Sequence, residues 1–582
     1  MYTMEKSKDN LRILKVKINN KERYLGSYYN HKKDIDNFIN AIGKINDKTV
    51  VVTYGVLDGE YLLELSRIKS KSFKIIVFEK SDELIKKMKN DKYYNDFIED
   101  ERIKIFKYDE SKIDLILKNE LELANIYNVK TVDNEILYYY NSEEILKITK
   151  ELKKIITHNI INDNTIKHFS ERWFESFVKN FKYTLNSIFF EEIKNKFKNK
   201  SAIVISAGPS LEKNIELLKE CHEKFVIISG GRTLEKLKEI GVKPDFFIMI
   251  DGDEIAYDLV KENLKFNIPL IFCNATNEKI LQNHDGIKIY EPTSVDFIMN
   301  ILNRNAEGRF GGGSVAHACI STAIYLGCNN IIFIGQDLAY TNDKVHAEFC
   351  EAKDDKYKEE EVFDNIINKN DLFVDDIYGK KVRTSNPLNM FRENIEVIIK
   401  QHKDIKFINA TEGGAHINGS EVKFLNEVID LYGNSESINK NLELKPTLTE
   451  EEKDLIINEF KKTIQYLRYI KIKCSKLIEF NEKLKNLYNK DKLFAYDKLA
   501  KIMDILEKEL KELYLKVPYI KSLIYPIVVD VEINPIWNED DTELESEKFE
   551  KLYDKTKFLY STMKRKTEYA LNFIEKEWDV NE

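Results

Sequence analysis

A turn of small residues follows a strand-like apolar run near residue 205 and has the composition of an anion-binding loop. The turn consists of Ser206, Ala207, Gly208, Pro209 and Ser210. Ligands of α/β sheets bind beyond the carboxyl ends of the strands, and the first amides of a following helix favour a phosphate. Gly208 can adopt backbone angles that other residues avoid. The pattern lacks the Gly-Lys-Ser/Thr of a P-loop, and a tight turn capped by Ser210 is the alternative interpretation.

Two further strand-like runs end in polar residues. The run 225–228 leads to Gly231 and Arg232, and the run 246–250 leads to the acidic triplet 251–253. A guanidinium matches phosphate and carboxylate groups, so Arg232 could contact a ligand or could simply lie on the surface. The triplet contains two carboxylates at Asp251 and Asp253, which could bind a hard cation. Such an acid pair is a weak signal, and we expect no metal site.

A glycine run precedes the next helix-like segment and offers a second place for close ligand approach. Gly312 and Gly313 allow the backbone to approach a ligand, and Ser314 can cap the helix or contact a phosphate. The strand-like run that follows ends at Gln336 and Asp337. We expect these residues to border the same site as the first turn.

A histidine in a polar loop is the candidate general base. His346 follows the 331–334 run by a short loop, so it can reach the same edge of the sheet. An ordinary imidazole is partly neutral near pH 7 and can accept a proton. His317 lies one turn into a helix-like segment, where packing is the simpler role. We therefore expect His346, with Asp337, to be catalytic, although exposed loop histidines are common.

These residues require a multidomain α/β scaffold. Residues 1–165 contain strand, glycine turn, helix and strand in the order of a Rossmann-like unit, ending in Glu79. Its glycine fingerprint is incomplete, so we favour a scaffold over a nucleotide site. Residues 166–435 form the central Rossmann-like domain. Residues 436–582 are long, charged and periodic, which predicts a C-terminal helical domain.

Composition limits the cellular context. The chain has 582 residues, a formal net charge of -8 and 6 widely spaced cysteines without a C-x-x-C pair. This charge argues against nucleic acid as the main partner, and the cysteine pattern indicates free thiols in a reducing cytoplasm. The first ten residues lack the apolar core of a secretory signal, and no apolar run is long enough to span a bilayer. We expect a cytoplasmic protein with no membrane span.

The ordered set of motifs resembles the motility-associated factor (Maf) family of flagellin glycosyltransferases. The resemblance covers about residues 201–419 and rests on the segments Ser206–Leu211, Gly230–Leu234, Lys243–Asp251, Phe310–Ala316, Gly327–Tyr340 and Asn409–Ile417. It implies transfer of a nonulosonic acid, of sialic, legionaminic or pseudaminic type, from its CMP donor to Ser or Thr of flagellin, with inversion. Flagellum assembly and motility would depend on this reaction.

The central domain is also similar to bacterial sialyltransferases, which implies roles for individual residues. Gly208, Pro209 and Ser210 would lie near the CMP phosphate and ribose. Gly312, Gly313 and Ser314 would border the donor carboxylate or phosphate, and Gln336 and Asp337 would stand at the strand-end acid. His346 is the nearest match by order to the base of those enzymes. They need no metal, so magnesium is conceivable but not expected, and no other cofactor is implied.

Two alternatives come from other classes of function. The same motifs resemble archaeal hydroxymethylpterin diphosphokinases, in which the turn would hold ATP and Asp251 with Asp253 would hold magnesium. The additional terminal regions make a small-molecule kinase less favoured. A non-catalytic chaperone that binds flagellin is the third interpretation. In both flagellin-related interpretations, the long helices after residue 447 would hold the helical end of flagellin.

Overall fold

The computed structural model describes residues 2–18, 21–46, 48–68, 73–132, 135–293, 296–305, 313–351, 371–433, 436–537 and 543–578. Its contacts divide the chain into two compact units, Met1–Thr165 with Tyr525–Leu559, and Ile166–Ile524 with Tyr560–Glu582. One boundary between the two units falls after Thr165. The expected helical segment 436–582 is divided, because residues 525–559 contact the first unit and the rest contact the second.

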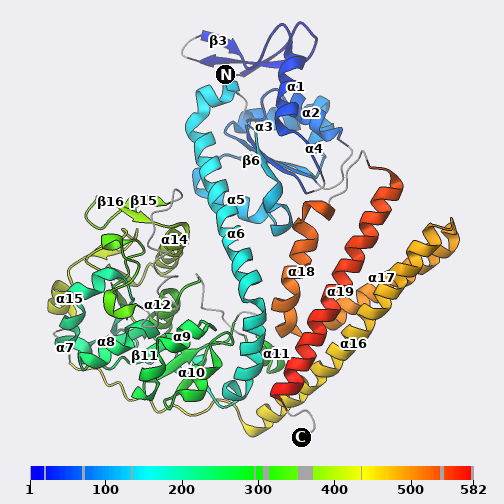
Figure 1. The fold of residues 1–582 in the computed structure, drawn as a ribbon. Coiled ribbons are helices and arrows are strands. Elements are labelled where there is room, and N and C mark those ends of the chain that lie inside the picture. Colours follow the sequence, from blue (N-terminus) through cyan, green and yellow to red (C-terminus); the bar gives the residue numbers. More distant parts are fainter. Residues whose placement is uncertain are drawn as a thin grey trace. The chain divides into compact units, whose positions relative to one another are not determined.

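The first unit combines two sheets with short helices (Figure 1). An antiparallel sheet contains β1 (Tyr2–Lys6), β2 (Arg12–Ile18) and β3 (Lys21–Tyr24). A parallel sheet has the order β6-β5-β4-β7, formed by β4 (Val50–Tyr54), β5 (Lys74–Glu79), β6 (Ile103–Lys107) and β7 (Val129–Thr131). The helices of this region are α1 (His31–Ile42), α2 (Glu60–Ser66), α3 (Asp82–Lys89), α4 (Asn95–Ile98) and α5 (Ile113–Glu120).

In the first unit, side chains and loop amides fill the space around the glycine turn between β4 and α2. Glu79, at the end of β5, is buried, and its carboxylate accepts hydrogen bonds from the Val56 and Ser81 amides at 2.9 and 2.7 Å. A side chain at Gly59 would meet the Tyr94 ring at 2.8 Å. The acid that would bind a ribose is therefore occupied by loop amides.

The second unit is built on one parallel sheet with the order β18-β17-β14-β9-β10-β11-β12-β13-β8. Its strands are β8 (Ile188–Phe189), β9 (Ser201–Ile205), β10 (Val226–Gly230), β11 (Phe246–Met249), β12 (Leu270–Phe272), β13 (Lys288–Tyr290), β14 (Asn330–Ile334), β17 (Lys406–Asn409) and β18 (Glu421–Val422). The central strands are apolar runs buried on both faces, as expected for a parallel sheet covered on both sides. The α/β fold class predicted from the sequence is confirmed.

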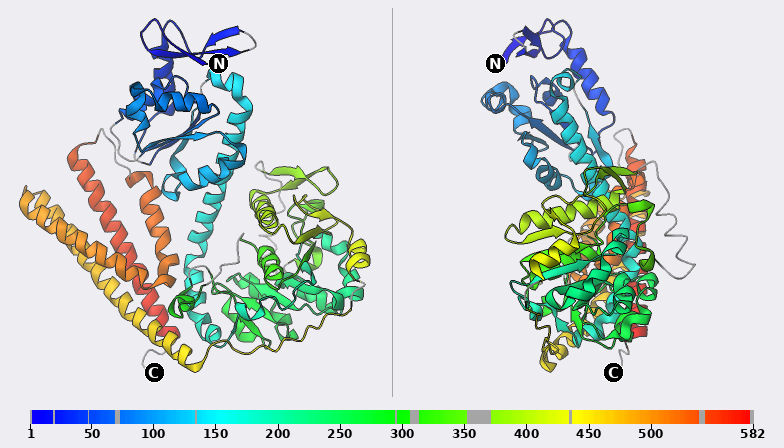
Figure 2. Two further views of the ribbon diagram at one scale, coloured as in Figure 1. Left: turned by 180° about the vertical axis from the view of Figure 1, so that it is seen from behind. Right: turned by 90° about the vertical axis from the view of Figure 1, so that its left-hand side faces the viewer.

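Helices and one hairpin surround this sheet (Figure 2). The helices are α7 (Leu218–Cys221), α8 (Leu234–Glu239), α9 (Glu254–Asp258), α10 (Glu278–Asn283), α11 (Phe297–Ile301), α12 (Val315–Tyr325), α14 (Asn386–Gln401) and α15 (Leu425–Tyr432). The hairpin is β15 (Leu372–Asp375) with β16 (Lys381–Thr384), paired antiparallel.

Strand order places a topological switch point beside β9. From β9 the chain proceeds to β10, β11, β12 and β13 on one side, and later to β14 and β17 on the other. Loops leave β9 and β14 in opposite directions, which opens a crevice at their carboxyl ends. The sequence clusters at 206–210 and 335–337 lie at this position.

Long helices complete the chain. They are α6 (Glu135–Leu185), α16 (Glu450–Tyr488), α17 (Leu493–Leu515), α18 (Lys521–Ile533) and α19 (Glu545–Glu577), and the periodicity of the C-terminal segment predicted α16, α17 and α19 among them. A capping box at Thr449 and Glu452 begins α16, which packs against α17 (Figure 1). In the second unit, Phe460 of α16 stacks on Phe181 of α6 at 4.6 Å between ring centroids. Tyr519 stacks on Phe177 at 4.8 Å, so these helices share one aromatic core with the sheet domain.

Candidate functional site

A cavity of about 390 Å³ lies at the carboxyl ends of the central strands. Such a volume is typical of small-molecule sites. Nine of the residues proposed from the sequence line it: Ala207, Gly208, Gly231, Arg232, Asp251, Ser314, Gln336, Asp337 and His346. The strand-end clusters therefore meet in one place, as predicted for the edge of a parallel sheet. Gly312 lies outside the described residues.

The turn after β9 is fixed to the end of β14. The Gly208 amide donates to the Gly335 carbonyl at 2.8 Å, and the Ser206 hydroxyl donates to Gln336 Oε1 at 2.6 Å. Gly208 has φ -65° and ψ 157°, which any residue can adopt. Glycine is needed for space instead, because a Cβ there would lie 2.1 Å from Asp337 Oδ1. The expectation of unusual backbone angles at Gly208 is thus wrong, and a steric reason replaces it.

The turn leads into a 3-10 turn at Pro209–Lys213 rather than directly into an α-helix. Pro209 and Ser210 are buried and lie behind the cavity wall, in contrast to Ala207 and Gly208. The Ser210 hydroxyl donates to Asp337 Oδ1 at 2.6 Å and so is engaged inside the protein. Direct contact of Pro209 and Ser210 with a phosphate, expected from the resemblance, therefore lacks support in this geometry. Their role here is to shape the turn.

Asp337 is the internal anchor of this turn. Its second carboxylate oxygen accepts from the Thr341 hydroxyl at 2.6 Å, and the Ser210 amide approaches both oxygens at 3.3 Å. Burial raises the pKa of Asp337 to about 6, while the two hydroxyl donors oppose the rise. Because hydroxyl groups occupy both oxygens, this geometry favours positioning over proton transfer for Asp337.

His346 lines the cavity beside Arg232, and the residue is partly exposed. Burial and the Arg232 guanidinium lower the pKa of His346 to about 3, and a hydrogen bond to the Ala207 backbone opposes this. The imidazole is therefore neutral near pH 7, but its affinity for a proton is lower than that of the ordinary imidazole assumed from the sequence. An anion bound at Arg232 would partly restore it.

Ser314 sits at the entrance of α12 and is held by a buried histidine. Its hydroxyl lies 2.8 Å from His317 Nδ1, and His317 Nε2 lies 2.9 Å from the Phe391 carbonyl. A carbonyl can only accept, so Nε2 carries the hydrogen and Nδ1 accepts from Ser314. His317 is 1% exposed and burial lowers its pKa, which confirms the packing role expected for it. Gly313, before Ser314, has φ 77°.

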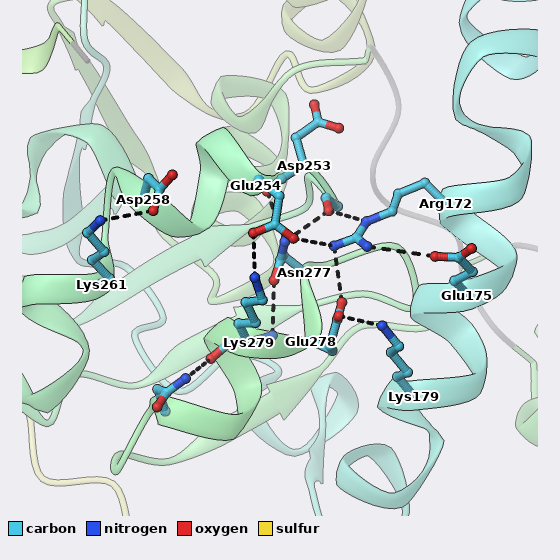
Figure 3. Close-up of polar contacts among 12 residues, drawn as sticks. Arg172, Glu175, Lys179, Asp253, Glu254, Asp258, Lys261, Asn277, Glu278 and Lys279 are labelled. Carbon is cyan, nitrogen blue, oxygen red and sulfur yellow. Dashed lines mark hydrogen bonds and ion pairs between the residues drawn. The ribbon is translucent and has the colours of Figure 1, made fainter. Parts of the chain in front are cut away.

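The acidic loop after β11 lines the cavity, and side chains of other segments hydrogen-bond its backbone. Both Asp251 and Asp253 line the cavity. Arg172 of α6 donates from Nε to the Gly252 carbonyl at 2.5 Å (Figure 3). Asn277 donates to the carbonyls of Gly252 and Asp253, both at 3.0 Å. The backbone of the loop is therefore fixed by side chains from α6 and from the start of α10.

A network of ion pairs supports Arg172 in turn. Its guanidinium lies 3.2 Å from Glu278 and 3.6 Å from Glu254, and Lys179 binds Glu278 at 2.7 Å (Figure 3). Nothing in the sequence marked this contact, because Arg172 is one charged residue among many on a long helix. Among the residues that the structure describes, no group of three His, Cys, Asp or Glu side chains could hold a metal ion.

Apolar side chains form most of the remaining cavity wall. They are Ile205, Met249, Ile255, Ala256, Leu259, Val260, Val315, Ala316, Cys319, Leu338, Val345, Leu388 and Phe391. Leu388 and Phe391 come from α14, whose sequence carries an ordinary amphipathic pattern and no site signal. In the described part of the chain, no helix is long and apolar enough to cross a membrane.

Sequence comparisons match the central part of the chain to a pterin diphosphokinase family model and to two proteins. A family model described as 6-hydroxymethylpterin diphosphokinase MptE-like matches residues 175–343. An uncharacterised protein of Treponema pallidum (strain Nichols) is 30% identical over 117 residues, 20% of this chain and 53% of that protein. The chain thus spans about half the length of this relative. A 6-hydroxymethyl-7,8-dihydropterin pyrophosphokinase of Methanocaldococcus jannaschii is 26% identical over 202 residues, 31% of this chain and 79% of that protein.

A solved structure is similar to this chain over almost its whole length. The Maf glycosyltransferase of Magnetospirillum magneticum AMB-1 matches with a TM-score of 0.58 and 12% identity, over 99% of this chain and 93% of that one. The likeness named from the sequence motifs is therefore confirmed at the level of fold: this chain has the fold of a Maf glycosyltransferase, with a central part that is also similar to hydroxymethylpterin diphosphokinases.

Proposed function

We propose that this protein is a glycosyltransferase that moves a nonulosonic acid from its CMP donor to Ser or Thr of flagellin. The observation that carries the proposal is the cavity at the switch point, where the turn after β9, Arg232 and two acidic strand ends converge in a Maf-like fold. The reaction would proceed with inversion in the cytoplasm and would support flagellum assembly and motility.

The cavity wall carries groups that could bind the phosphate or carboxylate of a CMP-sugar. Among the described lining residues, Arg232 carries the one positive charge, and a guanidinium binds phosphate or carboxylate through parallel hydrogen bonds. CMP is a good leaving group once its phosphate is stabilised, so fixed donors around it would supply much of the rate. The backbone at Ala207, Gly208 and Gly231 is also on the wall and lets the ligand approach closely.

An ATP-dependent pterin diphosphokinase is the second candidate. The family-model match and the Methanocaldococcus relative favour it, as do the two carboxylates at Asp251 and Asp253 near the cavity. Those carboxylates would hold magnesium with ATP. The long helices outside the matched region argue for a larger acceptor than a pterin.

Isothermal titration separates the two. The full-length protein would be titrated with CMP, and with ATP plus Mg²⁺, and then tested for sugar transfer to purified flagellin by intact mass. Binding of CMP and a mass increase of flagellin support the transferase. Binding of ATP without CMP binding would replace it with the kinase.

A further inference from the structure

Three titratable side chains on the cavity wall differ in what their polar atoms already contact. Asp337 accepts hydroxyl hydrogen bonds on both oxygens. His346 is hydrogen-bonded to the Ala207 backbone and lies beside Arg232. Asp251 lines the same cavity, its side chain is exposed, and among the described residues no donor hydrogen-bonds its carboxylate. Asp251 therefore presents open acceptor oxygens to a ligand.

The surroundings of Asp251 favour a basic carboxylate. The enclosing walls and the neighbouring Asp253 raise its pKa to about 6, and Arg232 opposes the rise. The nearby Cys273 thiol is neutral because burial raises its pKa to about 11. Solvent reaches Asp251 through the open cavity, which limits the shift until a ligand displaces that water.

Neighbouring residues fix the backbone of the loop that carries Asp251. The backbone carbonyl of Asp251 accepts a hydrogen bond from the backbone N–H of Asn277 at 3.0 Å. Gly252 is packed so tightly that a Cβ there would lie 2.8 Å from the Ala275 carbonyl. Arg172 and Asn277, which bind the loop carbonyls, form what we call the loop clamp. Figure 3 shows Arg172 reaching the loop from α6, with the Asp253 carboxylate directed away from the ion pairs.

We propose that Asp251 accepts the proton of the acceptor hydroxyl, and that Arg172 of the loop clamp is a positioning residue for it. This inference rests on the proposed function. The acceptor oxygen forms a bond to the anomeric carbon as the bond from that carbon to the phosphate oxygen breaks. CMP leaves with the electron pair, and the hydroxyl proton passes to Asp251 and then to solvent.

The test compares isosteric and clamp variants of the full chain. Asp251→Asn keeps the shape but removes the acceptor charge, and His346→Gln is the rival variant. Arg172→Met opens the loop clamp, Arg172→Lys is the conservative variant, and Lys179→Met is the matched control, because Lys179 binds Glu278 without touching the loop. Transfer turnover, CMP affinity, the unfolding midpoint and the effect of EDTA would be measured for each.

The expected pattern separates a base from a merely structural residue. Asp251→Asn lowers turnover by about a hundred- to ten-thousand-fold with CMP affinity within about threefold, since a lost general base typically costs that much. Arg172→Met lowers turnover about tenfold or more at an unchanged unfolding midpoint, Arg172→Lys recovers part of it, and Lys179→Met stays within about threefold. Wild-type turnover falls as the pH drops below about 6, because protonated Asp251 cannot accept a proton.

Several results would overturn the inference. They are Asp251→Asn turnover within about tenfold of wild type, a larger loss in His346→Gln, or EDTA inactivation that Mg²⁺ reverses, which would make Asp251 a metal ligand. Equal losses in Arg172→Met and Lys179→Met would reduce Arg172 to a structural role. A wild-type protein that binds ATP but not CMP would refute the proposed function itself, whereas normal transfer by Asp251→Asn refutes this inference alone.

Discussion

Replacing Gly208 with alanine tests the packing of the turn that borders the cavity. The new Cβ would lie 2.1 Å from Asp337 Oδ1 and 2.5 Å from the Gly335 carbonyl. To reach an ordinary contact near 3.4 Å, the Asp337 carboxylate would have to move by about 1.3 Å and the Gly335 carbonyl by about 0.9 Å. Moving Asp337 breaks its short hydrogen bonds from Ser210 and Thr341, both 2.6 Å. Hydrogen bonds to charged groups contribute about 1.5–3 kcal/mol each. We therefore expect the free energy of unfolding to fall by about 3 kcal/mol or more.

The matched control is Gly241→Ala. Gly241 has φ +77° and no heavy atom within 4 Å of the added Cβ, so its cost is the left-handed backbone alone, about 1–2 kcal/mol. Urea unfolding followed by tryptophan fluorescence suits this comparison, because Trp173 and Trp578 both lie in the second unit. CMP affinity should also fall in Gly208→Ala. A Gly208→Ala protein as stable as Gly241→Ala, with wild-type CMP affinity, would refute the steric argument.

Three further predictions concern charge, pH and packing. Arg232→Met should weaken CMP binding by about tenfold or more by calorimetry and Arg232→Lys by less, since a point charge replaces part of the guanidinium; equal affinities would place the phosphate elsewhere. Burial raises the pKa of Asp337, so the folded state binds its proton more tightly than the unfolded chain does, and the free energy of unfolding falls as the pH rises from about 4 to about 6. This dependence of the free energy of unfolding on pH should flatten in Asp337→Asn, and an unchanged dependence would contradict the raised pKa. Phe460→Ala should lower the free energy of unfolding in urea by about 3–5 kcal/mol, because Phe460 is 1% exposed within the aromatic core. Phe494→Ala, at an 87% exposed position, should change it by about 0.5 kcal/mol or less, and similar effects of the two variants would contradict that packing.

The sheet and the place of the site were predictable because they depend on local pattern. Apolar runs of strand length, each ending in glycine or an acid, identify buried parallel strands, and their carboxyl ends meet at one edge. That reasoning brought Arg232, Asp251 and Ser314 to one cavity from separate segments. The long helices were equally clear, because their apolar residues recur at helical spacing over many turns.

The remaining features depend on contacts between distant segments. Ser210 is buried against Asp337, which is 127 residues later in the chain, so its exposure could not be judged from its own turn. The same neighbour explains why position 208 must be glycine. Arg172 reaches the acidic loop from α6, 80 residues earlier, and nothing in its surrounding sequence marks it. The low basicity of His346 likewise follows from the Arg232 charge, a neighbour in space rather than in sequence.

Packing also changes what a C-terminal truncation should do. If the helices after residue 447 hold flagellin, a chain ending near residue 435 would be expected to lose flagellin binding and keep the nucleotide site. In the structure, Phe460, Tyr519 and Trp578 pack against the α6 aromatics of the second unit. Their removal would expose that core, so recognition of flagellin is better tested by surface substitutions on α16 and α17 than by truncation.

Transfer of a nonulosonic acid from its CMP donor to flagellin is the most direct test of the central claim. The measurement is the intact mass of flagellin after incubation with the full-length protein and a CMP-nonulosonate, with CMP release followed in parallel. We predict a mass increase equal to whole sugar residues and an equal release of CMP. Unmodified flagellin, together with diphosphate transfer from ATP to a hydroxymethylpterin, would contradict the account and assign the cavity to the kinase reaction.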